Sequence, residues 1–101
     1  MSDEINYGSY LQLDDLLALQ TPVSTPAHPD ELLFIIVHQA SELWFKALLH
    51  EMSSLADAFE AYDAGQVLWR LQRINALMRL VSAQLSSLET LPPQHCAQFR
   101  T

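Results

Sequence analysis

Apolar residues recur every three or four positions in two long stretches of the chain, a pattern that predicts amphipathic α-helices. The first stretch covers about 29–62 and the second about 66–89. The segment 63–65, Asp-Ala-Gly, is expected to end the first helix, because glycine is disfavoured inside a helix and common just beyond its end. So short a connection predicts that the two helices pack antiparallel as a hairpin. The apolar positions expected on one side of the second helix are Val67, Leu71, Ile74, Leu77, Met78, Val81 and Leu85.

The segments outside this hairpin are shorter. Residues 7–20 have helical spacing and predict an amphipathic helix of about three turns, which would form an N-terminal arm. Residues 21–30 contain three prolines and predict a stiff linker. Residues 92–101 begin with two prolines and predict the start of a further helix. We therefore expect an all-α fold in which residues 1–101 form a single helical unit.

The first long helix is too long for a compact domain of this size. With about 32 residues in helical conformation, it would extend roughly 48 Å at 1.5 Å per residue. The radius of gyration of a compact 100-residue domain is about 13 Å. We expect part of the helix's apolar surface to be covered by another chain or by a further part of the same protein.

Composition and charge narrow the function classes. Half of the 101 residues are hydrophobic and the net charge is −7, which argues against a nucleic-acid partner. Glu42 and Lys46 interrupt the longest apolar run, so we expect no membrane span. The acidic N-terminus is unlike a secretory signal, and the single Cys96 has no partner for an internal disulfide, so a cytoplasmic location is expected. Residues 1–65 carry eleven acids and one base, whereas the remainder carries four arginines and one acid, which favours packing of one half on the other.

One histidine, His38, lies inside the longest apolar run, "LLFIIVHQASELWFKALLHE", with Phe34 one helical turn before it. A histidine in such a place is more often structural than functional. Zinc-protease and di-iron spacings are absent, and there is no glycine-rich phosphate loop. Glu42 could share a metal with His38, but no third ligand is evident, so no metal site is predicted. Pattern alone therefore predicts an acidic helical hairpin with one unexplained histidine.

Three blocks of the sequence are more specific than its periodicity. In order, they are "YGSYLQLDDLLALQ", "HPDELLFIIVHQASELWFKALLHE" and "LETLPPQHCAQFR". Together they resemble the N-terminal part of the tryptophan 2,3-dioxygenase family. That family consists of mostly helical, tetrameric haem enzymes of the kynurenine pathway. They insert both atoms of dioxygen across the indole C2–C3 bond of L-tryptophan to give N-formylkynurenine.

The resemblance implies a place in the site for six residues. His38 would be the distal histidine that faces the indole N–H, and Phe34 would form the apolar wall over the haem and the substrate ring. Tyr7 and Tyr10 would reach into the pocket of a neighbouring subunit. Arg100 would bind the substrate carboxylate, for which its planar guanidinium is suited. Cys96 stands where the family usually has an aromatic ring that helps to enclose the substrate.

The same resemblance implies what these residues would lack. The proximal ligand of the haem b iron belongs to the later part of the family's sequence and is not expected in this chain. Two hypotheses follow. The chain is either the distal part of a haem dioxygenase that works with the remaining part, or a truncated and catalytically inactive helical module that self-associates through its apolar face.

Overall fold

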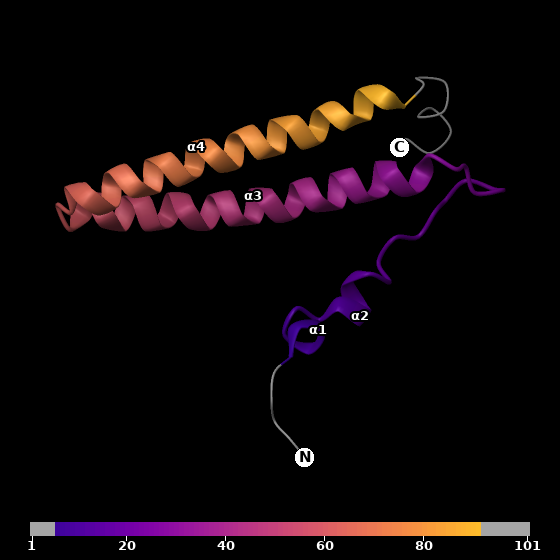
Figure 1. Ribbon diagram of the computed structural model, residues 1–101, viewed down its shortest axis with the longest axis horizontal. Coiled ribbons are helices and arrows are strands. Elements are labelled where there is room, and N and C mark those ends of the chain that lie inside the picture. Colours follow the sequence, from indigo (N-terminus) through magenta and orange to yellow (C-terminus); the bar gives the residue numbers. More distant parts are fainter. Residues whose placement is uncertain (1–5, 92–101) are drawn as a thin grey trace, which may run out of the picture.

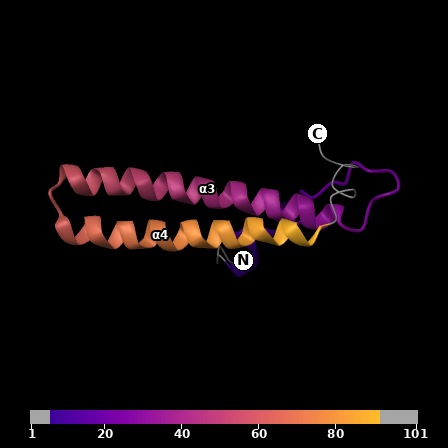
Figure 2. The ribbon, with the colours of Figure 1, turned by 90° about the horizontal axis from the view of Figure 1, so that it is seen from above.

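The computed structural model describes residues 6–91, and its main feature is a pair of long antiparallel helices, α3 (Glu31–Glu60) and α4 (Ala64–Ser86). They lie side by side along their whole length in both views (Figures 1 and 2). A short 3₁₀ helix, η1 (Ser87–Thr90), follows α4. The described residues contain helices and no strand, so the all-α class is confirmed. The predicted further helix over 92–101 lies outside the described residues.

The turn between the long helices differs from the predicted one. The left-handed residue that ends α3 is Tyr62, with a φ of 54°, and not the expected Gly65. The amide of Tyr62 donates to the carbonyl of Phe59 at 3.1 Å and that of Asp63 to the carbonyl of Ala58 at 3.0 Å, the two bonds of a Schellman motif. Asp63 then caps α4 by accepting from the amide of Gln66 at 3.0 Å. Gly65 therefore lies in the first turn of α4, because the aspartate cap starts that helix two residues earlier than its apolar pattern does.

The two helices meet along one narrow row of residues from each, which we call the seam. Its members alternate in steps of three and four, the heptad spacing of antiparallel coiled-coil packing. From α3 they are Phe34, Val37, Ser41, Trp44, Leu48, Glu51, Leu55 and Ala58. From α4 and η1 they are Val67, Arg70, Ile74, Leu77, Val81, Gln84 and Leu88.

The seam corrects the prediction for the second helix. Leu71, Met78 and Leu85 were expected on the packed side, yet all three are exposed. They form a second apolar row beside the seam, and Arg70 and Gln84 take places in the seam instead. The reason is that both polar side chains find partners on α3, which an apolar periodicity does not reveal.

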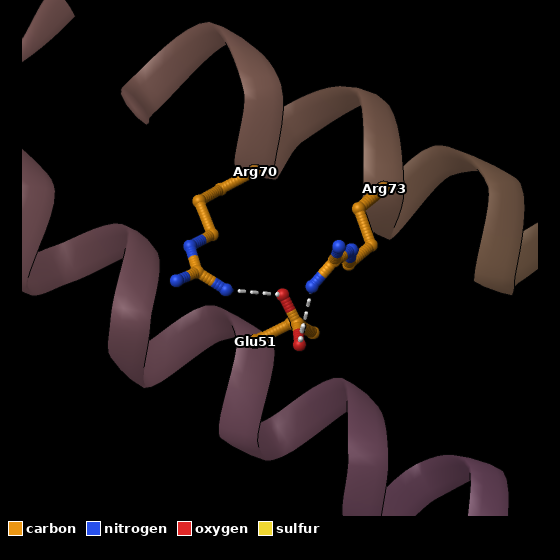
Figure 3. A network of polar contacts seen from close by, with 3 residues as sticks. All are labelled: Glu51, Arg70 and Arg73. Carbon is orange, nitrogen blue, oxygen red and sulfur yellow. Dashed lines mark hydrogen bonds and ion pairs between the residues drawn. The ribbon is translucent and has the colours of Figure 1, made fainter. Parts of the chain in front are cut away.

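Glu51 joins the acidic and basic halves of the chain (Figure 3). This buried carboxylate of α3 accepts from Arg70 at 3.0 Å and lies 3.5 Å from a guanidinium nitrogen of Arg73, both on α4. The hydrogen bond from Arg70, with the nearby charges, holds the pKa of Glu51 below its usual range in spite of burial. The expected attraction between the two halves is thus found at this point of the hairpin.

The N-terminal arm is not the single helix expected over 7–20. It consists of two four-residue helices, α1 (Tyr7–Tyr10) and α2 (Leu13–Leu16), separated at Gln12, whose φ of 54° is left-handed. A capping box between Asn6 and Ser9 closes the first turn. Isolated helices this short are marginal in water, so one unfavourable dihedral is enough to interrupt the predicted helix.

Glu31 ties the linker to the start of α3. Its side chain is only 2% exposed and accepts hydrogen bonds from the amides of Val23 at 2.7 Å and Ser24 at 3.2 Å, and from the Ser24 hydroxyl. Burial is the largest influence and raises the pKa of Glu31, but these hydrogen bonds together outweigh it, so the pKa lies below the usual value. Glu31 is the first residue of α3, and its side chain binds the linker residues Val23 and Ser24 that precede the helix.

The described part of the chain is extended, as the length of α3 predicted. Its radius of gyration is 18.3 Å, above the roughly 13 Å of a compact domain of this size. Of the helices in residues 6–91, α3 alone is long and apolar enough to cross a membrane by those two criteria. The sequence argument from Glu42 and Lys46 is therefore not sufficient, although helices inside larger soluble proteins meet the same criteria.

Candidate functional site

The candidate site is centred on His38, whose ring has a defined direction. Its Nδ1 lies 2.8 Å from the carbonyl oxygen of Phe34, one turn earlier on α3. A carbonyl only accepts, so Nδ1 carries the proton of this hydrogen bond. In the neutral ring Nε2 is therefore the acceptor, and the described residues leave His38 exposed. The histidine presents a hydrogen-bond acceptor to whatever covers this side of α3.

The aromatic ring of Phe34 packs against the His38 ring. Their centroids are 4.3 Å apart with an interplanar angle of 35°. The expected pairing of these two residues on one face of the helix is thus found. The imidazole is held by a backbone carbonyl on one side and an apolar ring on another, which restricts its rotation.

The side of α3 that carries His38 has several exposed apolar residues and is bordered by Glu42 one turn after His38, and we call it the His38 face. At steps of seven residues from His38, Phe45, Met52 and Phe59 follow along the same side of α3, all exposed. Phe59 also lines an apolar hollow with Leu71 of α4, so the exposed rows of the two helices meet there. Such a face can contact a flat apolar group, and His38 presents a hydrogen-bond acceptor to it near the start of α3.

The described residues offer no set of metal ligands. Residues 6–91 contain no group of three histidine, cysteine, aspartate or glutamate side chains placed to hold an ion. His50 lies on the same helix as His38, roughly 18 Å further along its axis. Glu42, the other residue weighed as a metal partner, lines a hollow beside the arm with Lys46, and the two form no ion pair there.

A polar network in the seam lies directly behind the site and was not predicted. The side-chain amide of Gln84 accepts from the indole nitrogen of Trp44 at 3.1 Å and donates to the carbonyl of Val37 at 3.3 Å. The Ser41 hydroxyl donates to the same carbonyl at 2.7 Å. The signal in the sequence was a glutamine and a serine at heptad positions among apolar residues, which a search for hydrophobic spacing alone passes over.

The arm is attached to α3 by a second unpredicted residue, Gln39. Its side chain donates to the carbonyl of Leu19 at 2.9 Å and accepts from Gln20 at 2.9 Å. Leu16 and Leu43 line the apolar hollow at this junction. The arm thus contacts α3 on a side different from the His38 face, since Gln39 follows His38 by about 100° around the helix.

The two tyrosines of the arm are not brought to His38 within the chain. Tyr7 and Tyr10 are 77% and 70% exposed, and α1 packs on α2. Figure 1 shows α1 standing well apart from the hairpin. Arg100 and Cys96, the predicted carboxylate and ring contacts, lie outside the described residues.

Fold and site together define an all-α protein that presents one oriented imidazole, beside an aromatic ring, on an exposed apolar helix face. The family model described as tryptophan 2,3-dioxygenase matches residues 1–101. This chain belongs to the tryptophan 2,3-dioxygenase family. The resemblance seen in the three sequence blocks is therefore confirmed.

Curated relatives agree with this assignment. The tryptophan 2,3-dioxygenase of Kineococcus radiotolerans is 50% identical over 97 residues, which cover 96% of this chain and 34% of the relative. That of Rhodococcus jostii is 46% identical over 99 residues, covering 98% and 35%. That of Herpetosiphon aurantiacus is 44% identical over 100 residues, covering 99% and 38%. The chain spans about a third of the length of these relatives.

Proposed function

We propose that this chain forms the distal wall of a haem-dependent tryptophan 2,3-dioxygenase, which inserts dioxygen across the indole C2–C3 bond of L-tryptophan to give N-formylkynurenine. The observation that carries the proposal is the orientation of His38. Its Nδ1 is bound to the carbonyl of Phe34 at 2.8 Å, so Nε2 is directed outward as an acceptor. An indole N–H is a donor that can meet this acceptor.

The residues present fit one side of a haem group. A haem ring is flat and mostly apolar, and Phe34 with the exposed apolar row of the His38 face would pack over it. The bound haem would supply the iron at which dioxygen reacts. A ligand for the haem iron would come from the remaining part of the family's sequence, since residues 6–91 contain no group of three metal-binding side chains.

His38 and Phe34 would orient the substrate. The imidazole would accept from the indole N–H and so select one edge of the ring. The aromatic ring of Phe34 would exclude water from the indole plane. Both groups are preorganised, since their mutual packing and the backbone hydrogen bond exist without a ligand.

The arm and the C-terminal residues would complete the pocket. We propose that Tyr7 and Tyr10, exposed at the end of the arm, reach the pocket of a neighbouring copy in a tetramer. Arg100 would bind the substrate carboxylate, and Cys96 would lie near the substrate ring. A cytoplasmic location also belongs to this proposal.

The test uses a complemented protein, defined as this chain joined to the remaining part of the Kineococcus radiotolerans relative. The wild type is expected to show a Soret band and tryptophan-dependent oxygen uptake. His38→Ala is expected to lower turnover by about 10- to 100-fold through loss of substrate orientation. His50→Ala, an exposed histidine on the same helix, is the matched control and should keep the activity.

Two results would contradict the proposal. Loss of haem in His38→Ala would mean that this residue holds the cofactor and is not the distal acceptor. Equal turnover of L-tryptophan and 1-methyl-L-tryptophan by the wild type would mean that no acceptor reads the indole N–H, since the methyl group replaces that hydrogen.

The second candidate is an inactive module that self-associates. The many large apolar side chains that the described residues leave exposed on α3 and α4 favour it. In that case mixing the chain with haem and the remaining part of the relative would give no oxygen uptake. Sedimentation of the chain alone would then show a stable oligomer.

A further inference from the structure

We propose that Gln84 is a positioning residue for this site: its side-chain amide fixes the rotation of α3 and thereby the direction of the His38 ring. The inference rests on the proposed function and names a residue that the family resemblance does not assign. Gln84 lies on α4, on the opposite side of the seam from the residues that would contact the substrate.

The Gln84 amide holds α3 at two points. Its Nε2 donates to the carbonyl of Val37 at 3.3 Å, and its Oε1 accepts from Trp44 Nε1 at 3.1 Å. These two contacts are seven residues apart on α3, which is one heptad of the seam. Because both ends of the amide are used, neither a rotation nor a slide of α3 leaves the contacts unchanged.

The turn of α3 that carries His38 is the one that Gln84 holds. Val37 immediately precedes His38, is buried, and its carbonyl also accepts from the buried Ser41 hydroxyl. His38 is bound to the backbone of its own helix through Phe34, so its ring turns with α3 as a unit. A productive site must be held within about 0.5 Å and 10–20°. An apolar seam alone permits small rotations, whereas polar seam contacts specify one register.

The test compares three variants of the haem-loaded complemented protein. Gln84→Met keeps the length and removes both contacts. Gln84→Glu keeps an acceptor for Trp44 and removes the donor to the Val37 carbonyl. Val81→Ala, a buried seam residue one turn earlier on α4, is the control that weakens packing and leaves the amide contacts intact.

Two readouts are needed. The first is the preference, in kcat/KM, for L-tryptophan over 1-methyl-L-tryptophan, which reports whether His38 meets the indole N–H. A preference of about tenfold, the worth of one hydrogen bond, should fall to within about twofold in both Gln84 variants and persist in Val81→Ala. The second is amide hydrogen exchange of residues 34–41, which should accelerate in Gln84→Met.

The outcomes separate the two proposals. An active wild type whose preference survives in Gln84→Met overturns the inference alone and leaves the proposed function standing. Retention of the preference in Gln84→Glu overturns it as well, because the contact to Trp44 would then suffice. A loss of preference in Val81→Ala equal to that in Gln84→Met also overturns it, since packing would then be the cause. A wild type without dioxygenase activity refutes the proposed function and this inference together.

Discussion

Replacing Tyr62 by glycine should stabilise the hairpin. Tyr62 ends α3 with a φ of 54° and is 95% exposed, so the substitution relieves the backbone with little loss of side-chain contact. The left-handed conformation costs an L-residue roughly 1–2 kcal/mol. Glycine's greater freedom in the unfolded chain offsets about 0.5–1 kcal/mol of this. The net gain should be about 1 kcal/mol, because the hydrogen bonds of the turn are made by backbone atoms and stay in place.

Urea unfolding followed by circular dichroism at 222 nm measures this gain. With a slope of about 2 kcal/mol per molar urea, the midpoint should rise by about 0.5 M. All variants are compared at one protein concentration, because association would add to the apparent stability. Tyr62→Ala is the control for loss of the ring and should leave the midpoint almost unchanged.

The neighbouring glycine supplies the opposite test. Gly65 lies in the first turn of α4 without a positive φ, and an added Cβ would meet its nearest atom at 3.7 Å, an ordinary contact. Gly65→Ala should therefore stabilise by about 0.5–1 kcal/mol. If Gly65→Ala destabilises, or Tyr62→Gly does no better than Tyr62→Ala, the turn is formed by Gly65 and our account of it is refuted.

Three further predictions concern the arm, the buried ion pair and the substrate. Gln39→Ala removes both side-chain hydrogen bonds between α3 and the arm, which together are worth about 2 kcal/mol. Limited proteolysis of residues 11–20 should therefore become at least tenfold faster. An unchanged cleavage rate would show that apolar contacts hold the arm. Arg70 lowers the pKa of Glu51, so the ionised Glu51 stabilises the fold above the unfolded pKa of about 4.3, and this stabilisation is lost as pH falls through the folded pKa. The decline in melting temperature between pH 6 and pH 3.5 should therefore be shallower in Glu51→Gln than in the wild type. An equal decline in the two proteins would refute this prediction. Arg100→Ala in the complemented protein should mainly raise KM for L-tryptophan, because a carboxylate pair forms already in the ground state, and an unchanged KM would exclude carboxylate binding.

Much of the fold could be predicted from the sequence. The positions of α3 and α4 and their antiparallel packing follow from local periodicity and a short connection, which act within a few residues of each other. The interrupted arm and the turn at Tyr62 could not be predicted in the same way. Whether a residue other than glycine adopts the left-handed conformation depends on two opposing free energies, the cost of the strained dihedral and the gain from hydrogen bonds made by neighbouring residues. Tyr62 and Gln12 are the two examples in the described residues.

The candidate site was predictable in part. His38 and Phe34 are one turn apart, so their contact required only that α3 be a helix. The hydrogen bond from His38 Nδ1 to the Phe34 carbonyl, which leaves Nε2 as the acceptor, could be seen only in the structure. Gln39 and Gln84 were missed because a glutamine carries no chemical signature until its partners are known.

The sequence by itself determined the two long helices and the family, because these depend on neighbours along the chain or on a matching block of residues, and it predicted His38 and Phe34 as the centre of the candidate site. Only the tertiary structure decided which of two adjacent apolar rows of α4 faces α3. That choice depends on Arg70 meeting Glu51, 19 residues away, and on Gln84 meeting Trp44 and Val37, which lie 40 and 47 residues away. Such pairs exist only after the chain has reversed, and burial then favours the row in which the Arg70 guanidinium and the Gln84 amide each meet a partner on α3.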